Sequence, residues 1–250
     1  MNKYLKNLNR IEFVVTMACS GRCKHCSQGN HISNEHIDDV KAQQAIYDIC
    51  SHYNIDSLMT FGGEPLLYPE TVCKIHSAAR KMNIPQRELI TNGYFSKDIG
   101  RIKEVANMLA QSGVNGICLS VDAFHQETIP LEYVKEFASA VVKEEISIHT
   151  HPAWLVSADD DNPYNLKTRE MLNEFSEIGI EQSSGNVIFP SGNALKYLGE
   201  YFDQDVEYDN PYRENPKDVK TISFSANGDV LCRNIYKDSI LEIMGSYSIT

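Results

Sequence analysis

Short runs of β-branched and aromatic residues alternate along this chain with longer runs whose apolar residues recur at helical spacing. The runs with strand character are 11–17, 57–61, 88–91, 116–122, 147–151 and 186–190. The runs with helical spacing are 38–51, 69–82, 99–111, 131–143 and 166–178. Ser, Asp, Asn, Gly or Pro marks most of the junctions between them. Strands that alternate with helices of this length predict βαβ units and a parallel sheet.

The number of strands and the last part of the chain limit the possible architectures. Six strands are fewer than the eight that close a (β/α)8 barrel, so a doubly wound sheet or an incomplete barrel remains. Residues 191–220 are rich in Tyr, Asp, Asn and Pro, and the runs 221–225 and 229–232 flank Asn227-Gly228, a hairpin signal. We expect a main unit over 1–190 and a small β appendage over 191–250, which is not an independent domain.

Composition and charge exclude several classes of protein. The 250 residues are 42% hydrophobic and carry 23 Lys+Arg against 34 Asp+Glu, a net charge of −11. This is neither a disordered nor a collagen-like composition, and the acidic balance argues against a nucleic-acid partner. No apolar run approaches the ~20 residues that span a bilayer, and the first residues lack the features of a signal peptide. We therefore expect a cytoplasmic protein that binds no membrane.

Three of the seven cysteines lie close together, directly after the first predicted strand. Cys19, Cys23 and Cys26 follow the spacing C-x3-C-x2-C. Three thiolates on a cubane iron–sulfur cluster leave one iron without a protein ligand, and an open metal position binds exchangeable ligands. The alternative is a Cys3His zinc site completed by His31, because His25 is adjacent to Cys26 and badly placed for the same metal. Structural zinc usually uses two separated ligand pairs, and the sequence has no second pair.

This cysteine motif resembles the signature of the radical S-adenosylmethionine (radical SAM) enzymes. The resemblance implies that Cys19, Cys23 and Cys26 hold a [4Fe-4S] cluster whose fourth iron chelates the amino and carboxylate groups of SAM. It also implies a (β/α)6 partial TIM barrel. In that family, reductive cleavage of SAM yields a 5′-deoxyadenosyl radical that abstracts hydrogen from a substrate, and burial of the site protects the radical.

Further motifs extend the resemblance as far as about residue 190. The GGE element, the TNG element, the SxD element and the proline that opens P-x-G-R-A imply SAM contacts by Gly62, Gly63, Glu64, Asn92, Ser120, Asp122 and Pro190. All of them lie at the carboxyl ends of predicted parallel strands, where barrel active sites are built. The chain departs from the family at Asn193, which replaces the usual Arg. It also has no Arg between Val121 and Glu145, where SPASM-type relatives often use one for the SAM carboxylate.

Strand alternation places further polar side chains on the inner face of the sheet. If Ile117, Leu119 and Val121 pack on helices, their neighbours Cys118, Ser120 and Asp122 face inward. The same reasoning turns His149 and His151 inward, either as acid–base groups and ligand contacts or as hydrogen-bonded core groups. His125, just past the fourth strand, is either a substrate contact or an ordinary loop residue.

Cys232 ends the segment SFSANGDVLC, which is similar to segments that begin SPASM or twitch appendages. Too few thiols remain nearby to hold a second cluster. Cys232 is either a hydrogen-atom donor to a substrate radical, as in some peptide epimerases of the family, or a small buried hydrophobic residue. The other cysteines within helical runs are expected to be core residues.

The resemblance is closest to SPASM/twitch-like enzymes that modify peptides or proteins. We therefore expect an oxygen-sensitive enzyme that matures a ribosomally made peptide, by epimerisation or cross-linking for example, with flavodoxin or ferredoxin as the electron donor. This substrate class rests on analogy. One alternative is a radical SAM enzyme acting on a sugar, nucleoside or cofactor precursor, and a glycyl-radical activase fits less well. The other is a non-catalytic iron–sulfur or zinc binding module.

Overall fold

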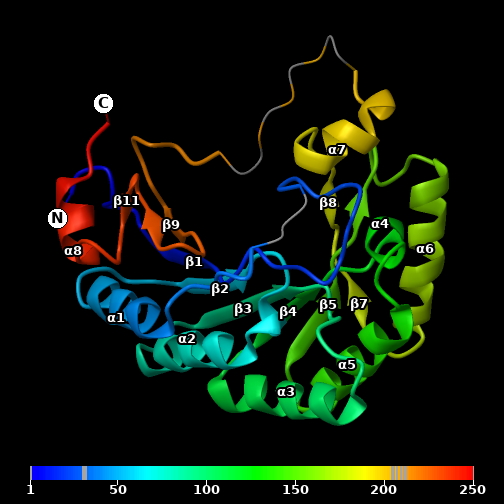
Figure 1. Ribbon diagram of the computed structural model, residues 1–250, viewed down its shortest axis with the longest axis horizontal. Helices are drawn as coiled ribbons and strands as arrows, with labels where there is room; N and C mark the ends of the chain where they lie inside the picture. Colours follow the sequence, from blue (N-terminus) through cyan, green and yellow to red (C-terminus); the bar gives the residue numbers. More distant parts are fainter. Residues whose placement is uncertain are drawn as a thin grey trace.

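Seven parallel strands form one sheet in the part of the chain that the computed structural model describes, residues 2–29, 33–203, 206, 208, 210 and 213–249. The strand order is β7-β5-β4-β3-β2-β1-β9 (Figure 1). The strands are β1 Arg10–Val14, β2 Ser57–Phe61, β3 Gln86–Thr91, β4 Gly116–Leu119, β5 Ser147–Thr150, β7 Glu181–Gln182 and β9 Thr221–Phe224. The predicted α/β partial-barrel class is confirmed.

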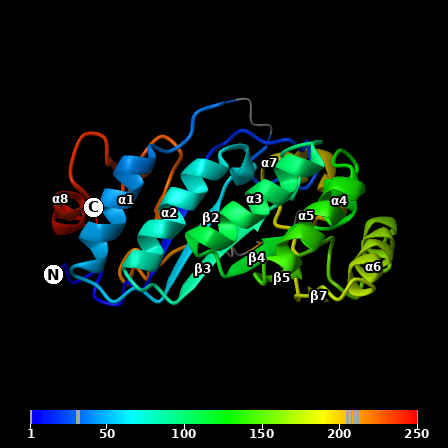
Figure 2. The same ribbon diagram turned by 90° about the horizontal axis from the view of Figure 1, so that it is seen from below.

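Helices connect these strands and cover one face of the sheet. The longer helices are α1 Asp39–Cys50, α2 Pro69–Lys81, α3 Ile99–Ser112, α5 Leu131–Lys143 and α6 Pro163–Ser176. Figure 2 shows α1, α2, α3 and α5 side by side across the sheet. The short helices are α4 Ala123–Gln126, α7 Gly192–Tyr197 and α8 Ile240–Ser246, with 3-10 turns η1 Pro65–Leu67 and η2 Gly199–Tyr201. Every strand of the sheet therefore points its carboxyl end toward the same edge.

The main core lies between the sheet and this helical layer. Ile117, Leu119 and Val121 are fully buried, as the alternation predicts, and belong to one continuous apolar cluster with the helices. Cys118, between Ile117 and Leu119, points to the other face, where burial, and then the charge of Glu88, raises the pKa of its thiol to about 11. The alternating strand pattern therefore separates a packed outer face from a polar inner face.

Two of the predicted strands pair differently from the prediction. The run 186–190 forms β8 Asn186–Val187, which pairs with β6 Ala153–Trp154 in a separate two-stranded sheet, and β7 takes the place beside β5. The predicted turn at Asn227-Gly228 forms, with Gly228 N donating to Ser225 O at 2.8 Å and Ser225 N donating to Asp229 O at 2.9 Å, but the runs on either side of it pair with other strands. β9 pairs in parallel with β1, while β10 Asp229–Val230 pairs with β11 Arg233–Asn234. β8 and β9 each pair with a strand distant in sequence, which local patterns do not specify.

The last segment packs against the start of the chain. The rings of Phe13 in β1 and Phe224 in β9 stack with centroids 4.7 Å apart, and both side chains are fully buried. Helix α8 lies against α1, and both chain ends lie at this side of the molecule (Figure 1). The main apolar core thus continues into the tail, and the boundary at residue 190 stays a prediction.

None of the helices in the described part of the chain is long and apolar enough to cross a bilayer. The cytoplasmic location stays a prediction.

Candidate active site

The loop after β1, residues 16–29, carries the three clustered cysteines and is called the cluster loop below. Cys19, Cys23 and Cys26 are all free thiols. The backbone N–H of Gly21 donates to Cys19 Sγ at 3.4 Å, and Cys26 N donates to Cys23 O at 3.3 Å. Burial raises the pKa of the Cys19 thiol to about 11 and also raises the pKa of Cys23. Binding of a metal by these groups therefore displaces protons.

Gly62 and Gly63 bring the end of β2 into direct contact with the cluster loop. Gly63 N donates to Thr16 O, and Glu64 N donates to Ala18 O, both at 2.8 Å. A Cβ atom on Gly63 would lie 2.1 Å from Ala18 O. Gly62 has a φ of +148°, and a Cβ atom there would lie 2.4 Å from Thr16 O. Glycine is required at both positions because backbone packs on backbone.

The Glu64 carboxylate is fully buried and joins the ends of β2 and β3. One oxygen accepts from Leu66 N at 2.9 Å and from Thr91 Oγ1 at 2.7 Å, and the other accepts from Asn92 N at 2.8 Å. Burial raises the pKa of Glu64 to about 7 against the lowering effect of these hydrogen bonds. Glu64 thereby fixes the position of Asn92, and its own contact with SAM stays a prediction.

Asp122 occupies a similar buried position at the end of β4. Its carboxylate accepts from the backbone N–H groups of Phe124, His125 and Ala153 at 2.9–3.1 Å, and from His125 Nδ1 at 2.8 Å. Burial alone would raise the pKa of Asp122, but His125, His25 and these hydrogen bonds together lower it. His125 Nε2 makes no hydrogen bond to the described residues. Asp122 therefore orients an imidazole with one free ring nitrogen.

The ring of His25 from the cluster loop lies beside this pair. Its centroid is 4.6 Å from that of His125 and 5.1 Å from that of Phe124. Burial lowers the pKa of His25 to about 4, so the ring is neutral near pH 7. Ligand atoms of His25, Asp122 and His125 lie within 4.8 Å of one another, a possible metal site. However, both Asp122 oxygens already accept two hydrogen bonds, which favours an orienting role over metal ligation.

The two histidines predicted to face inward differ in their contacts. His151 Nδ1 is 2.8 Å from Ser183 Oγ, and Asn186 Nδ2 donates to His151 Nε2 at 2.9 Å. Both ring nitrogens of His151 thus join the residue that follows β5 to Ser183 and to the first residue of β8. His149 pairs with Cys118 in the sheet register, and its ring makes no hydrogen bond to the described residues. Its imidazole is available to a ligand, and both catalytic assignments stay predictions.

The structure brings most of the other predicted contacts to this edge but not Cys232. Ser120 N donates to Thr91 O at 2.9 Å, and Pro190 immediately precedes the segment that contacts the cluster loop. Cys232 is exposed between β10 and β11 near Tyr247, whose ring contacts Tyr4 ahead of β1. Among the described residues, no contact joins Cys232 to the cluster loop, and its role as a hydrogen donor stays a prediction.

The number and pairing of the ligands favour a cluster over zinc. Structural zinc usually takes four protein ligands in two separated pairs, whereas the cluster loop offers three thiols. His31, the fourth ligand of the zinc alternative, lies outside the described residues. Three thiols that leave one metal position open fit a [4Fe-4S] cluster held by Cys19, Cys23 and Cys26.

Two buried polar atoms beside the cluster loop fit a second group. His25 Nδ1 and Gln126 Nε2 are buried and have no hydrogen-bond partner in the described part of the chain. Buried polar groups are normally satisfied, so both atoms fit a polar cofactor such as SAM. Sequence reasoning missed Gln126, which gave no signal. It considered His25 only as a zinc ligand, although the position next to Cys26 already placed it at the site.

The comparison with family models decides the family. Residues 13–155, more than half of the chain, match the model of the radical SAM superfamily. This chain belongs to the radical SAM superfamily. The matched region contains the cluster loop and the strand ends up to β6. Members of this superfamily use a [4Fe-4S] cluster and SAM, and the residues described above fit both.

Curated relatives of this radical SAM chain match it over about half its length. The GTP 3′,8-cyclase of Desulforamulus reducens is 24% identical over 131 residues, which are 51% of this chain and 38% of that protein. The GTP 3′,8-cyclase of Clostridium perfringens strain 13 is 25% identical over 129 residues, 50% of this chain and 38% of the relative. The match thus spans about two-fifths of the relatives' length.

Solved structures share the fold over nearly the whole chain. Native anSMEcpe with bound AdoMet superposes with a TM-score of 0.61 at 15% identity, covering 94% of this chain and 80% of that one. Streptococcus suis SuiB bound to precursor peptide SuiA gives 0.62 at 12% identity, covering 97% and 65%. BtrN in complex with AdoMet and 2-DOIA gives 0.55 at 14% identity, covering 95% and 82%. The radical SAM fold therefore extends beyond the matched residues into the tail.

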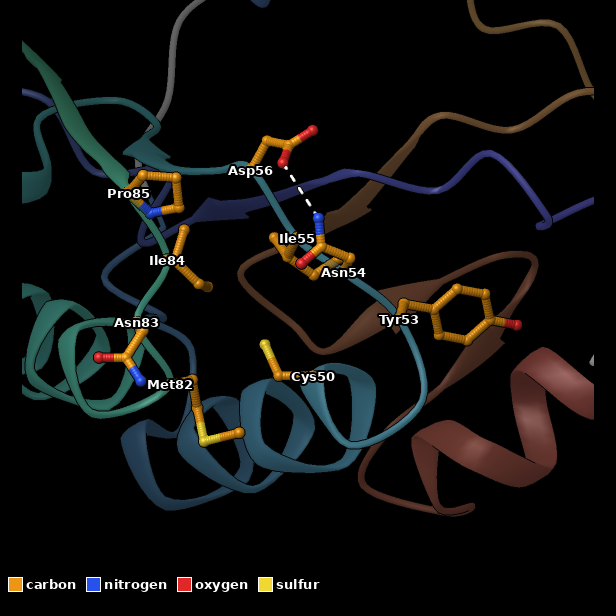
Figure 3. A pocket seen from close by; sticks show the side chains of 9 residues that line it. All are labelled: Cys50, Tyr53, Asn54, Ile55, Asp56, Met82, Asn83, Ile84 and Pro85. Carbon is orange, nitrogen blue, oxygen red and sulfur yellow. Dashed lines mark hydrogen bonds between the residues drawn. The ribbon is translucent and has the colours of Figure 1, made fainter.

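A cavity of about 330 Å³ lies at the opposite edge of the sheet, between the end of α1 and the turn from α2 to β3 (Figure 3). The side chain of Cys50 points toward it, and Asn54 Nδ2 donates to Asp56 Oδ1 at 3.4 Å. No predicted site residue lines this cavity. It is separate from the candidate active site.

Proposed function

We propose that this chain catalyses reductive cleavage of SAM and acts on a residue of a peptide or protein. The observation that carries the proposal is the cluster loop itself. It bears three free thiols and contacts the residues that follow β2, β3 and β4 at the carboxyl edge of a radical SAM barrel. When bound, the reduced cluster and SAM together supply a 5′-deoxyadenosyl radical that removes hydrogen from a C–H bond. Flavodoxin or ferredoxin is the proposed electron donor.

The residues of this chain divide into those that hold the loop and those with free donor or acceptor atoms. Gly62, Gly63 and Glu64 hold the cluster loop against β2 and β3 through backbone contacts. His25 Nδ1 and Gln126 Nε2 are available to bind SAM. Asp122 orients His125, whose free Nε2 binds ligand or moves a proton at that atom. The side chains of Glu64 and Asp122 and the atoms His25 Nδ1 and Gln126 Nε2 are buried away from bulk water.

A peptide or protein substrate is supported by the solved structures. SuiB is described with its precursor peptide, and anSMEcpe is described with the Cp18Cys and Kp18Cys peptides. These likenesses cover 95% or more of this chain, the tail included. The SPASM/twitch-like subtype and RiPP-type maturation are part of the proposal on the same grounds.

A small nucleotide substrate is the second candidate. It is favoured by the curated relatives, which are named GTP 3′,8-cyclase. These relatives match through about half of this chain, whereas the peptide-bound structures match almost all of it. We therefore place the peptide substrate first.

The activity is tested by anaerobic reconstitution, reduction and measurement of 5′-deoxyadenosine formed from SAM by mass spectrometry. The Cys23→Ser protein is expected to lose the product by at least 100-fold, because a ligand of the cluster is missing. Cys50→Ser is the matched control, since Cys50 is a free thiol at the other edge of the sheet, and it should retain activity. Zinc without acid-labile sulfide in the wild-type protein, or equal product from both variants, would contradict the proposal.

The substrate class is tested in the same assay by adding candidate peptides or GTP. We expect 5′-deoxyadenosine to rise with a peptide, together with a mass change of that peptide. A rise with GTP and a new nucleotide product would instead establish the second candidate.

A further inference from the structure

Two asparagine side chains reach the cluster loop from distant parts of the chain. Asn92 follows β3 and approaches the loop at Cys19. Asn193 lies in the first turn of α7 and approaches it at Cys23 and Cys26. Both are buried, at 4% and 5% exposure. Their contacts differ in kind, and this difference has a chemical consequence.

Asn92 directs an N–H group at a cysteine sulfur. Its Oδ1 accepts from Tyr94 N at 2.8 Å, which fixes the orientation of the amide. Nδ2 therefore faces Cys19 Sγ at 3.6 Å and Ser20 Oγ at 3.2 Å. The backbone of Asn92 is held in turn by the Glu64 carboxylate. Together with Gly21 N, Asn92 gives the Cys19 sulfur two N–H donors.

Asn193 contacts the loop through carbonyl oxygens. Its backbone N donates to Cys26 O at 2.9 Å, and its Nδ2 donates to Cys23 O at 3.1 Å. Ser191 Oγ adds a bond to Ser27 O at 3.1 Å. A Cβ atom on Gly192 would lie 2.3 Å from that same oxygen, so the two segments are in close contact. The residue that departs from the P-x-G-R-A pattern thus supports the backbone of two of the three cysteines.

We propose that these two amides have separable roles: Asn92 sets the reduction potential of the cluster, and Asn193 sets how firmly the loop retains it. Hydrogen bonds to cluster sulfurs are one of the factors that determine reduction potential, because they stabilise the more negative reduced form. Hydrogen bonds to backbone carbonyls restrain the loop and leave the charge on the cysteine sulfurs unchanged. The proposal rests on the proposed function only in that the three cysteines bind a cluster. Both are positioning residues.

The test uses the reconstituted full chain without SAM or substrate. The variants are Asn92→Ala, Asn193→Ala and the control Asn173→Ala, which changes an exposed residue of α6. The midpoint potential is measured by redox titration with EPR, and cluster retention by the rate of iron release to a chelator. At the wild-type midpoint, Asn92→Ala should lower the ratio of reduced to oxidised cluster about twofold to fivefold, with iron release unchanged. Asn193→Ala should release iron about threefold to tenfold faster at the wild-type potential.

A second pair of measurements keeps each half falsifiable if a variant assembles poorly. Asn92→Asp retains the acceptor for Tyr94 N but replaces the donor with a negative charge, so it should lower the potential further. In cluster-free protein, trypsin should cleave after Arg22 or Lys24 several-fold faster in Asn193→Ala than in wild type or Asn173→Ala. This readout holds even if the chain does not cleave SAM.

Three outcomes would overturn the inference. A wild-type reduction potential in both Asn92 variants would show that the N–H···S bond does not set the potential of the cluster. Wild-type iron release and wild-type proteolysis in Asn193→Ala remove the role of the loop contact. If each variant changes potential and retention together, the two amides share one structural role. Unchanged SAM cleavage beside any of these results would leave the proposed function standing.

Discussion

At the scale of single residues, the pKa values of two buried carboxylates at the site are shifted in opposite directions. Glu64 and Asp122 are both fully buried and both accept several hydrogen bonds. Burial raises the pKa of Glu64 to about 7, whereas the neighbouring histidines outweigh burial and lower the pKa of Asp122. The sequence predicts both as SAM contacts from their motifs. Their hydrogen bonds show that each also holds the loop that follows its strand.

A buried histidine outside the site should control part of the acid sensitivity of the fold. His76 in α2 is fully buried, its Nε2 lies 2.9 Å from Thr60 Oγ1, and its Nδ1 has no partner among the described residues. Burial, and then the charge of Arg87, lowers the pKa of His76 to about 3. The folded state therefore resists a proton that the unfolded chain accepts below about pH 6.5. The contribution of neutral His76 to the free energy of unfolding is therefore complete above pH 6.5 and is lost as the pH falls toward 3.

Replacing His76 with an apolar residue should remove its contribution to the pH dependence of the unfolding free energy. We would measure the free energy of unfolding in urea between pH 7 and 4.5. Below about pH 6, it should fall less steeply in His76→Leu than in wild type, by roughly 1.4 kcal/mol per pH unit. His52→Gln, at an exposed histidine, should follow wild type. A constant difference between wild type and His76→Leu at every pH would contradict this assignment.

At the scale of elements, helices follow from local sequence more closely than strands do. The prediction 131–143 coincides with α5. Helix α1 is one residue shorter than predicted at each end, and α2 is one residue shorter at its carboxyl end. Asp38 and Asp98 cap α1 and α3 by accepting backbone N–H groups of the first turn, a local interaction. By contrast, residues 186–190 have strand character but pair outside the main sheet. Helical hydrogen bonds are local, whereas a strand needs a partner from elsewhere in the chain.

The contact between the end of β2 and the cluster loop gives a prediction at this scale. Gly63→Ala places a methyl group where Ala18 O now lies, so the loop must move. We expect a loss of about 1–3 kcal/mol of stability from overpacking, measured by thermal unfolding, and less iron bound after reconstitution. Gly199→Ala is the control, because a Cβ atom there meets nothing within 4 Å. Wild-type iron content and melting temperature in Gly63→Ala would show that the contact is dispensable.

At the scale of the whole molecule, the tail completes one edge of the sheet. β9 covers β1, and its buried side chains join the cluster that contains Ile11 and Phe13. Because β9 shares its apolar cluster with the rest of the main sheet, we expect this part of the tail to unfold together with the sheet. The predicted division at residue 190 would then describe connectivity and not independent stability.

Removing one ring from this edge tests that view. Phe224→Ala should reduce the free energy of unfolding by about 3–5 kcal/mol and lower a single transition seen by both far-UV circular dichroism and tyrosine fluorescence. Val40→Ala, at a residue 68% exposed, should change it by less than about 0.5 kcal/mol. Two separate transitions in Phe224→Ala, with only the first shifted, would instead mark the tail as an independent unit.

The sequence by itself determined the fold class, the three cysteines of the cluster loop and the strand ends around them. These features are local, because βαβ periodicity, glycine pairs and cysteine spacing are each contained in a short stretch of chain. The parallel sheet and its buried outer face agree with that prediction.

Only the tertiary structure decided which distant residues meet at the loop. It placed β9 beside β1 and brought Asn193 to the carbonyl oxygens of Cys23 and Cys26. These contacts join residues more than 160 positions apart, and no local pattern encodes them. Their physical basis is the packing of distant segments in shared apolar clusters, which fixes where each strand ends and which side chains can reach the same atoms.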